Sequence, residues 1–277
     1  MPNFKASDGR SISYFDTEGA GPTVLCLAAL TRDSRDFADL ADHLGDAYRV
    51  VSMDYRGRGE SDWAKDPISE YQPMIEGRDA VEMLAHLQIT QSTIIGTSRG
   101  GLIGMGLAAH MPESVRALIL NDVGPEISES GVRLIMSYLG RPLSYPDFSA
   151  AAHGLQALFE EDFPTVTEAD WMKFAKRIFH DQNGRPVLSY DNKLRDAVQA
   201  VLDGPPVDLW PVFEAIRCPI LLIRGGNSSL LTKSAVEKMQ TAQPEMTMVE
   251  IPDRGHCPFL DEPEAVEAID TFLEQTL

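Results

Sequence analysis

The segment 96–100, Gly-Thr-Ser-Arg-Gly, constrains the fold of this chain more than any other feature. A β-branched run over residues 92–95 precedes it, and small and apolar residues follow it over 101–110. A strand, a G-x-S-x-G turn and a helix packed closely on a sheet form the context in which such a serine is presented as a nucleophile. The glycines permit a turn too tight for residues with a Cβ, and the N-terminus of the helix favours developing negative charge. The pattern therefore predicts Ser98 as a nucleophile at the end of a strand.

Strand and helix signals alternate on both sides of this motif. Strands are predicted at 11–16, 23–29, 48–53, 92–95, 115–120, 220–223 and 246–251. Helices are predicted at 34–44, 75–87, 101–110, 233–241 and 263–273. Strands bounded by helices at this spacing indicate an α/β protein with a doubly wound, mostly parallel sheet.

The middle of the chain follows a different pattern. Helices are predicted there at 128–139, 149–161, 168–180 and 192–202, with no strand of comparable strength between them. We therefore expect an α/β core built from residues 1–124 and 216–277, into which residues 125–215 are inserted as a set of helices.

Composition narrows the possible partners. The chain has 277 residues and a formal net charge of −18, so nucleic acid and anionic membrane surfaces would repel it. No apolar run approaches the roughly 20 residues that span a bilayer, and the N-terminus lacks the apolar stretch of a secretory signal. The cysteines, Cys26, Cys218 and Cys257, are three in number, which is typical of reduced thiols in a cytoplasmic protein. We expect a cytoplasmic protein that acts on a small molecule.

A serine nucleophile needs a base, and His256 is the best placed of the six histidines. It lies in the loop 252–264, between the last predicted strand and the last predicted helix, where proline and glycine bend and stiffen the chain. The others are expected on the surface, in packing or in the insertion: His43, His86, His110, His153 and His180.

Three motifs together make the chain resemble the α/β-hydrolase fold superfamily. They are the segment 54–62 (Asp-Tyr-Arg-Gly-Arg-Gly-Glu-Ser-Asp), the turn at Ser98 and the loop of Gly255 and His256. The resemblance implies that Ser98 is the nucleophile, and that His256 is the general base and later the acid for the leaving group. It also implies that the helices of 125–215 form a lid or cap. The order of serine before histidine agrees with that family.

The same resemblance places the oxyanion hole at two backbone N–H groups. One is that of Arg99, the residue after the nucleophile, and the other is that of Leu30, in the loop after the strand 23–29. Relatives often carry glycine in that loop, whereas this chain has alanines, so Thr31 or Arg32 remains an alternative donor. The Arg99 side chain is expected to have a structural partner, with a substrate carboxylate as the alternative.

The acid of the triad is where the sequence departs from the family. Relatives usually place an aspartate after the strand that is represented here by 220–223, and this chain has Ser229 at that position. A serine hydroxyl can orient the imidazole but cannot stabilise imidazolium by charge. Asp122, after the strand 115–120, is the leading substitute; Asp253 and a pair of Ser98 and His256 without an acid are the alternatives.

The insertion supplies the candidate substrate pocket. Its aromatic residues that could line an acyl or ring pocket are Trp171, Phe174, Tyr138 and Trp210, together with Phe148 and Phe179. No metal or organic cofactor is expected, because the chain has neither a cluster of His and Cys ligands nor a dinucleotide fingerprint. We expect a serine hydrolase of small esters or lactones that works through an acyl-enzyme. The alternatives are hydrolysis of a carbon–carbon bond in a β-diketone or ring-fission product, and a weakly catalytic ligand receptor.

Overall fold

An eight-stranded sheet forms the centre of the computed structural model, which describes residues 1–141 and 143–276. Its strands are β1 (Asn3–Lys5), β2 (Ser11–Asp16), β3 (Thr23–Leu27), β4 (Arg49–Met53), β5 (Ser92–Thr97), β6 (Val115–Asn121), β9 (Ile220–Gly225) and β10 (Thr247–Ile251). They follow the order β1-β2-β4-β3-β5-β6-β9-β10. β2 runs antiparallel to both β1 and β4, and all other neighbours are parallel. The predicted mostly parallel sheet is thereby confirmed.

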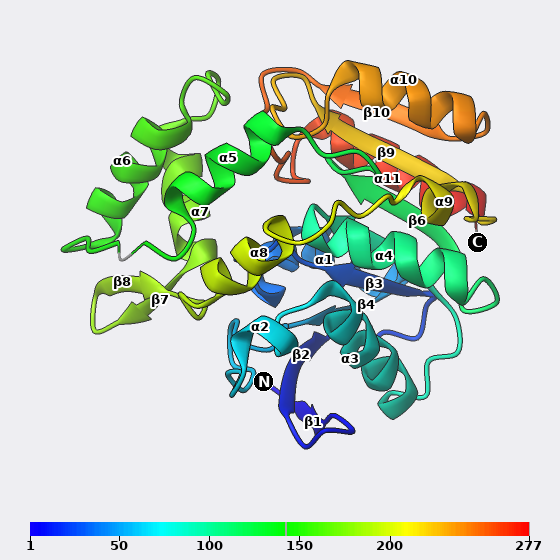
Figure 1. Ribbon diagram of the computed structural model, residues 1–277, viewed down its shortest axis with the longest axis horizontal. Coiled ribbons are helices and arrows are strands. Elements are labelled where there is room, and N and C mark those ends of the chain that lie inside the picture. Colours follow the sequence, from blue (N-terminus) through cyan, green and yellow to red (C-terminus); the bar gives the residue numbers. More distant parts are fainter. Residues whose placement is uncertain (142, 277) are drawn as a thin grey trace.

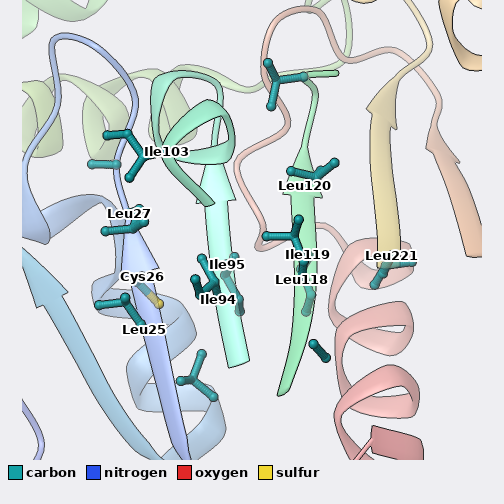
Figure 2. Packing of buried hydrophobic residues seen from close by; sticks show 14 of the residues in the cluster. Leu25, Cys26, Leu27, Ile94, Ile95, Ile103, Leu118, Ile119, Leu120 and Leu221 are labelled. Atoms are coloured by element: carbon teal, nitrogen blue, oxygen red, sulfur yellow. The ribbon is translucent and has the colours of Figure 1, made fainter. Parts of the chain in front are cut away.

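The central strands are buried on both faces. Figure 2 shows their side chains stacked across neighbouring strands: Leu25, Cys26 and Leu27 on β3, Ile94 and Ile95 on β5, and Leu118, Ile119 and Leu120 on β6. Each of these side chains is at most 1% exposed. Continuous apolar runs of this kind, without polar alternation, are typical of parallel strands that helices cover on both sides.

Helices cover both faces of the sheet. Figure 1 shows α3 (Pro73–His86), α4 (Arg99–His110) and α9 (Trp210–Glu214) in front of it, with α1 (Ala38–Leu44) and α11 (Pro263–Thr276) behind. The remaining helices of the core are η1 (Ser34–Phe37), η2 (Gly45–Ala47), α2 (Pro67–Glu70) and α10 (Lys233–Ala242). Among the described residues, no helix combines the length and the apolar character that crossing a membrane requires.

The segment of residues 125–215, which the sequence predicts as an insertion and which is called the inserted segment below, lies between β6 and β9. It contains α5 (Glu129–Tyr138), α6 (Phe148–Phe159), α7 (Glu168–Ile178), β7 (Phe179–Gln182), β8 (Arg185–Leu188) and α8 (Leu194–Leu202), followed by α9. Much of it lies to one side of the sheet (Figure 1), where α6 and α7 pack around an apolar cluster of their own. By contrast, α9 packs on α4 and on the main core.

One prediction for this segment is wrong. The helix expected over 168–180 ends at Ile178, and residues 179–188 form the antiparallel hairpin of β7 and β8. Asn183 and Gly184 make its turn with φ of 57° and 84°. Positive φ at both turn residues suits the twist of a two-residue hairpin, and Asn-Gly is the dipeptide that most favours it. The turn signal therefore prevailed over the helical spacing that precedes it.

Candidate active site

Ser98 sits in a strained turn between β5 and α4. Its backbone has φ of 50° and ψ of −112°, which side-chain-bearing residues rarely adopt. A Cβ at Gly96 would lie 2.6 Å from the carbonyl carbon of Gly100, and one at Gly100 would lie 1.9 Å from the Leu27 carbonyl oxygen. Only glycine fits at these two positions, so the motif dictates the turn that lifts Ser98 above the strand end.

His256 lies between Ser98 and Asp122. Its Nε2 is 2.8 Å from Ser98 Oγ, and its Nδ1 is 2.7 Å from Asp122 Oδ2. Because a carboxylate can only accept, Nδ1 carries the proton, and Nε2 is left to accept from the serine hydroxyl. The three side chains follow β5, β6 and β10, whose carboxyl ends meet at one edge of the sheet. The structure thus joins them in one hydrogen-bonded chain.

The loop that carries His256 is held from two sides. The side-chain amide of Asn121, the last residue of β6, donates to the Pro258 carbonyl at 3.0 Å. Glu262 accepts from the backbone N–H groups of Phe259 and Leu260 and from Arg254 Nε, which is 2.8 Å away. These contacts fix the loop on both sides of the imidazole, so the histidine is positioned before any ligand binds.

Asp122 is fully buried and fully hydrogen-bonded. It follows β6 with φ of 56°, a conformation that aspartate tolerates better than most residues. Its Oδ1 accepts from the Gly225 N–H at 2.9 Å, and its Oδ2 accepts from the Ser228 hydroxyl at 2.6 Å as well as facing His256. Asp253, the other carboxylate considered, has the positive φ of a turn residue. Within residues 1–141 and 143–276, no hydrogen bond joins Asp253 to His256.

The loop after β9 contributes differently from what the sequence predicts. Ser228, and not Ser229, donates its hydroxyl hydrogen to Asp122. The Ser229 carbonyl accepts from the hydroxyl of Ser128, and no side-chain hydrogen bond joins Ser229 to His256 in the described residues. The sequence analysis missed Ser228 and the Gly225 N–H. Both follow from topology, because β9 lies beside β6 and its loop therefore begins next to Asp122.

The two predicted oxyanion donors, Arg99 and Leu30, lie beside Ser98. Leu30 lines the same cavity as Ser98, and its carbonyl accepts from Arg58 Nε at 2.9 Å. Arg99 is the first residue of α4, where a backbone N–H has no partner within the helix. The Arg99 side chain points elsewhere: Nε donates to Glu76 at 2.7 Å and Nη2 to the Tyr71 carbonyl at 2.9 Å. Its partners are those of a structural residue.

Glu76 contacts the side chains of Arg99 and Arg58, which hold the two predicted oxyanion donors in place. This fully buried carboxylate on α3 pairs with Arg99 and, at 2.7 Å, with Nη1 of Arg58, which in turn holds Leu30. Burial alone would raise the pKa of Glu76, but the two guanidinium groups outweigh it, and the pKa lies below its usual value. Glu76 is therefore a carboxylate that ties the loop after β3 to the start of α4.

Glu76→Gln is expected to lower the free energy of unfolding by about 3–5 kcal/mol, because the buried charge of Arg58 loses its partner. Urea denaturation measures this loss. Glu129→Gln is the matched control: Glu129 and its partner Arg133 are 91% and 69% exposed, and their pair is worth about 0.5 kcal/mol or less. Equal losses in the two variants would contradict the role given to Glu76.

An apolar cavity of about 100 Å³ opens above Ser98 and His256. Four of the six predicted aromatic residues line it, together with leucines and other phenylalanines of the inserted segment: Trp171, Phe174, Tyr138 and Phe179. Phe148 is not in the described lining. Cys257 also lines it; burial raises the pKa of this thiol to about 12, so it stays protonated and a poor nucleophile at neutral pH.

Trp210 is a wrong prediction. It begins α9, stacks edge-on against Phe213 with 6.1 Å between ring centroids, and packs on the main core. It is absent from the described lining of the cavity. At Trp210 the chain already packs against the main core, so this aromatic residue covers α4 instead of the site. In the part of the chain that the structure describes, no three His, Cys, Asp or Glu side chains gather as metal ligands.

Comparisons with known proteins identify the family to which this fold belongs. The model of the alpha/beta hydrolase family matches residues 21–269. A 3-hydroxybutyrate-oligomer hydrolase of Cupriavidus necator is 36% identical, over 91% of this chain and 89% of that protein. A 3-oxoadipate enol-lactonase of Acinetobacter baylyi is 27% identical, over 81% and 79% of the two chains. The crystal structure of an alpha/beta hydrolase from Novosphingobium aromaticivorans superimposes with a TM-score of 0.93 at 40% identity, covering 99% of this chain and 97% of that one.

Proposed function

Because this chain belongs to the alpha/beta hydrolase family and is a hydrolase, we propose that it cleaves a small carboxylic ester through an acyl-enzyme on Ser98. The observation that carries the proposal is the hydrogen-bonded chain from Ser98 through His256 to Asp122 at the base of an apolar cavity. Nucleophile, base and orienting acid are the parts that acyl transfer to a serine requires.

In the first half of the reaction, Ser98 Oγ attacks the ester carbonyl and its proton passes to His256 Nε2. The carbonyl oxygen becomes an oxyanion, for which the backbone N–H groups of Arg99 and Leu30 are the proposed donors. His256 is then an imidazolium, which Asp122 stabilises by charge at 2.7 Å. Collapse of the tetrahedral intermediate breaks the bond to the alcohol, which leaves with the proton from Nε2.

In the second half, water replaces the alcohol. The water oxygen attacks the acyl carbon while His256 Nε2 takes a proton from the water. The backbone N–H groups of Arg99 and Leu30 then donate to the new oxyanion. Collapse breaks the bond to Ser98 Oγ, to which the proton of His256 returns, and the carboxylic acid leaves. Each group ends in its starting state, so the cycle needs nothing besides water.

The relatives favour an ester over the alternatives. Oligomers of a hydroxy acid are joined by carboxylic ester bonds, and the relative named for such an oligomer is the more similar of the two curated relatives above. An enol-lactone is a cyclic ester and would use the same steps. Cleavage of a carbon–carbon bond in a β-diketone would also use Ser98 and His256, but it requires a proton to be delivered to carbon instead of oxygen.

A substrate panel tests the proposal. Purified protein is given p-nitrophenyl and ethyl esters of short acids, simple lactones and β-diketones, and is labelled in parallel with a fluorophosphonate. We expect ester turnover and stoichiometric labelling of Ser98. Labelling without turnover of any substrate would support the ligand-receptor alternative, whereas faster turnover of β-diketones than of esters would overturn the assigned bond.

The wall of the cavity should set the preference for acyl length. Trp171→Phe shrinks a lining residue that is 1% exposed, and we expect it to change the ratio of kcat/KM between butyrate and acetate esters by about tenfold. Trp210→Phe is the matched control, because this tryptophan packs on the core. Comparable changes in the ratio for both variants would mean that Trp171 does not set the preference as part of the cavity wall.

A further inference from the structure

Arg32 places a permanent charge in the lining of the cavity. Among the described residues that line it, Arg32 alone bears a side chain that is ionised at every physiological pH. Arg32 belongs to the loop after β3, two residues beyond the proposed oxyanion donor Leu30. The remaining lining is largely aliphatic and aromatic, so this guanidinium is the one permanently charged hydrogen-bond donor that the described lining offers to a ligand beside Ser98.

The guanidinium is held on one side only. Its Nη1 donates to Asp36 Oδ1 at 2.7 Å, and its carbon lies 4.5 Å from the centre of the Phe174 ring, which also lines the cavity. The side chains of Arg32 and Asp36 are 12% and 8% exposed. No hydrogen bond joins Nε or Nη2 of Arg32 to the residues described here. Neither atom is among the fully buried atoms without a partner, so both keep some accessible surface on a side chain that lines the cavity.

This arrangement suits one kind of ligand group. Nε and Nη2 form the edge of the guanidinium fork that matches the two oxygens of a carboxylate. Asp36 leaves the pair of side chains with no net charge, and its own carboxylate would repel a dianion more strongly than a monoanion. With a net charge of −18 on the whole chain, a local cation is also needed for any anion to be retained.

We propose that Arg32 binds a free carboxylate of the substrate, so that the preferred esters carry a carboxylate in addition to the bond that is cleaved. This inference rests on the proposed ester hydrolysis at Ser98 and narrows its substrate class to half-esters of dicarboxylic acids and esters of hydroxy acids with a free acid end. Phe174 and Asp36 orient the fork, and the oxygens of the ligand complete its hydrogen bonds.

The test compares a charged ester with a neutral one of the same shape. Monoethyl succinate, glutarate and adipate are paired with the corresponding ethyl esters in which an amide replaces the free acid. The parent protein is expected to prefer the acid of the best-fitting length by about tenfold or more in kcat/KM. Arg32→Met is expected to bring the ratio of kcat/KM between the acid and the amide close to one, because the charge-assisted pair that distinguishes the two substrates is lost.

Two further variants serve as controls for the effect of Arg32→Met. Arg32→Met leaves Asp36 without a partner, so Arg32→Met/Asp36→Asn removes both charges and should show the same loss of preference in a stable fold. Arg133→Met deletes an exposed cation of α5 and should leave the preference unchanged. A preference for the acid that survives in both Arg32 variants would overturn the proposal.

Binding separates this inference from the proposed function. Calorimetry with the Ser98→Ala variant and monoethyl glutarate measures recognition without turnover, and Arg32→Met in that background should weaken binding by about tenfold or more. If neutral esters are hydrolysed but binding does not depend on Arg32, only the carboxylate subsite is wrong. If no ester is hydrolysed but binding depends on Arg32, the subsite stands and the assigned reaction is wrong.

Discussion

Ser98→Ala is expected to reduce kcat for ester hydrolysis by several orders of magnitude, toward the roughly 10⁶-fold loss that removal of a triad serine causes. Without Oγ no acyl-enzyme can form, and only the oxyanion donors and substrate binding remain. The fold should be unaffected, because the side chain points from a turn into the cavity and its backbone N–H still donates to the Asn121 carbonyl. Steady-state kinetics and thermal unfolding measure the two effects.

The matched control is Ser69→Ala, an exposed serine of α2, which should retain the parent activity. His256→Ala should be nearly as severe as Ser98→Ala, and the double variant should be no worse than either alone, since the two side chains act as a unit. Multiplicative losses in the double variant, or a Ser98→Ala protein within tenfold of the parent, would contradict the assignment of the nucleophile.

Asp122→Asn is expected to reduce kcat by about 10⁴-fold. The amide oxygen would stay with the Gly225 N–H, which needs an acceptor, and this leaves the amide NH₂ facing His256. The imidazole must then accept at Nδ1 and carry its proton on Nε2, where it cannot act as a base toward Ser98. The negative charge that stabilises imidazolium is lost as well.

Companion variants separate the candidate acids. Ser229→Asp should raise the rate little, because the Asp122 carboxylate already occupies Nδ1. Ser228→Ala should cost about tenfold, since it removes one charge-assisted hydrogen bond to that carboxylate. A large gain from Ser229→Asp combined with full activity in Asp122→Asn would mean that the parent works without an acid.

The α/β core could be predicted from the sequence because its signals are local. Apolar runs such as 220–223 indicate buried strands, and the glycines around Ser98 fit a turn that has no room for a Cβ at their positions. The hairpin of β7 and β8 was not predicted, although Asn183 and Gly184 are typical of its turn. The helical spacing that precedes it was extended beyond Ile178, where the helix ends. For short strands that follow a helix, the residues of the turn predict the structure better than the spacing of apolar residues does.

A site residue could be predicted only where the sequence offers few candidates for its role. Ser98 and His256 lie in sequence motifs that identify each of them. The identity of the acid depends instead on which strand ends lie side by side in the sheet. Because β6 pairs with β9, the loop after β9 begins beside Asp122, and Ser228 is the residue of that loop whose hydroxyl reaches the carboxylate. The sequence predicted Ser229, the next residue of the loop. Trp210 shows the same limit, since aromatic composition does not say which surface a helix covers.

Mass spectrometry of the protein after treatment with a β-lactone tests the central claim most directly. Opening of the ring by the nucleophile leaves an acyl group attached to it, which is the proposed intermediate in a slowly hydrolysed form. We expect one acyl group per chain on the peptide that contains Ser98, formed in step with the loss of esterase activity and absent from Ser98→Ala. A parent protein that hydrolyses esters yet stays unmodified, or that carries the acyl group on Cys257, would contradict an acyl-enzyme on Ser98.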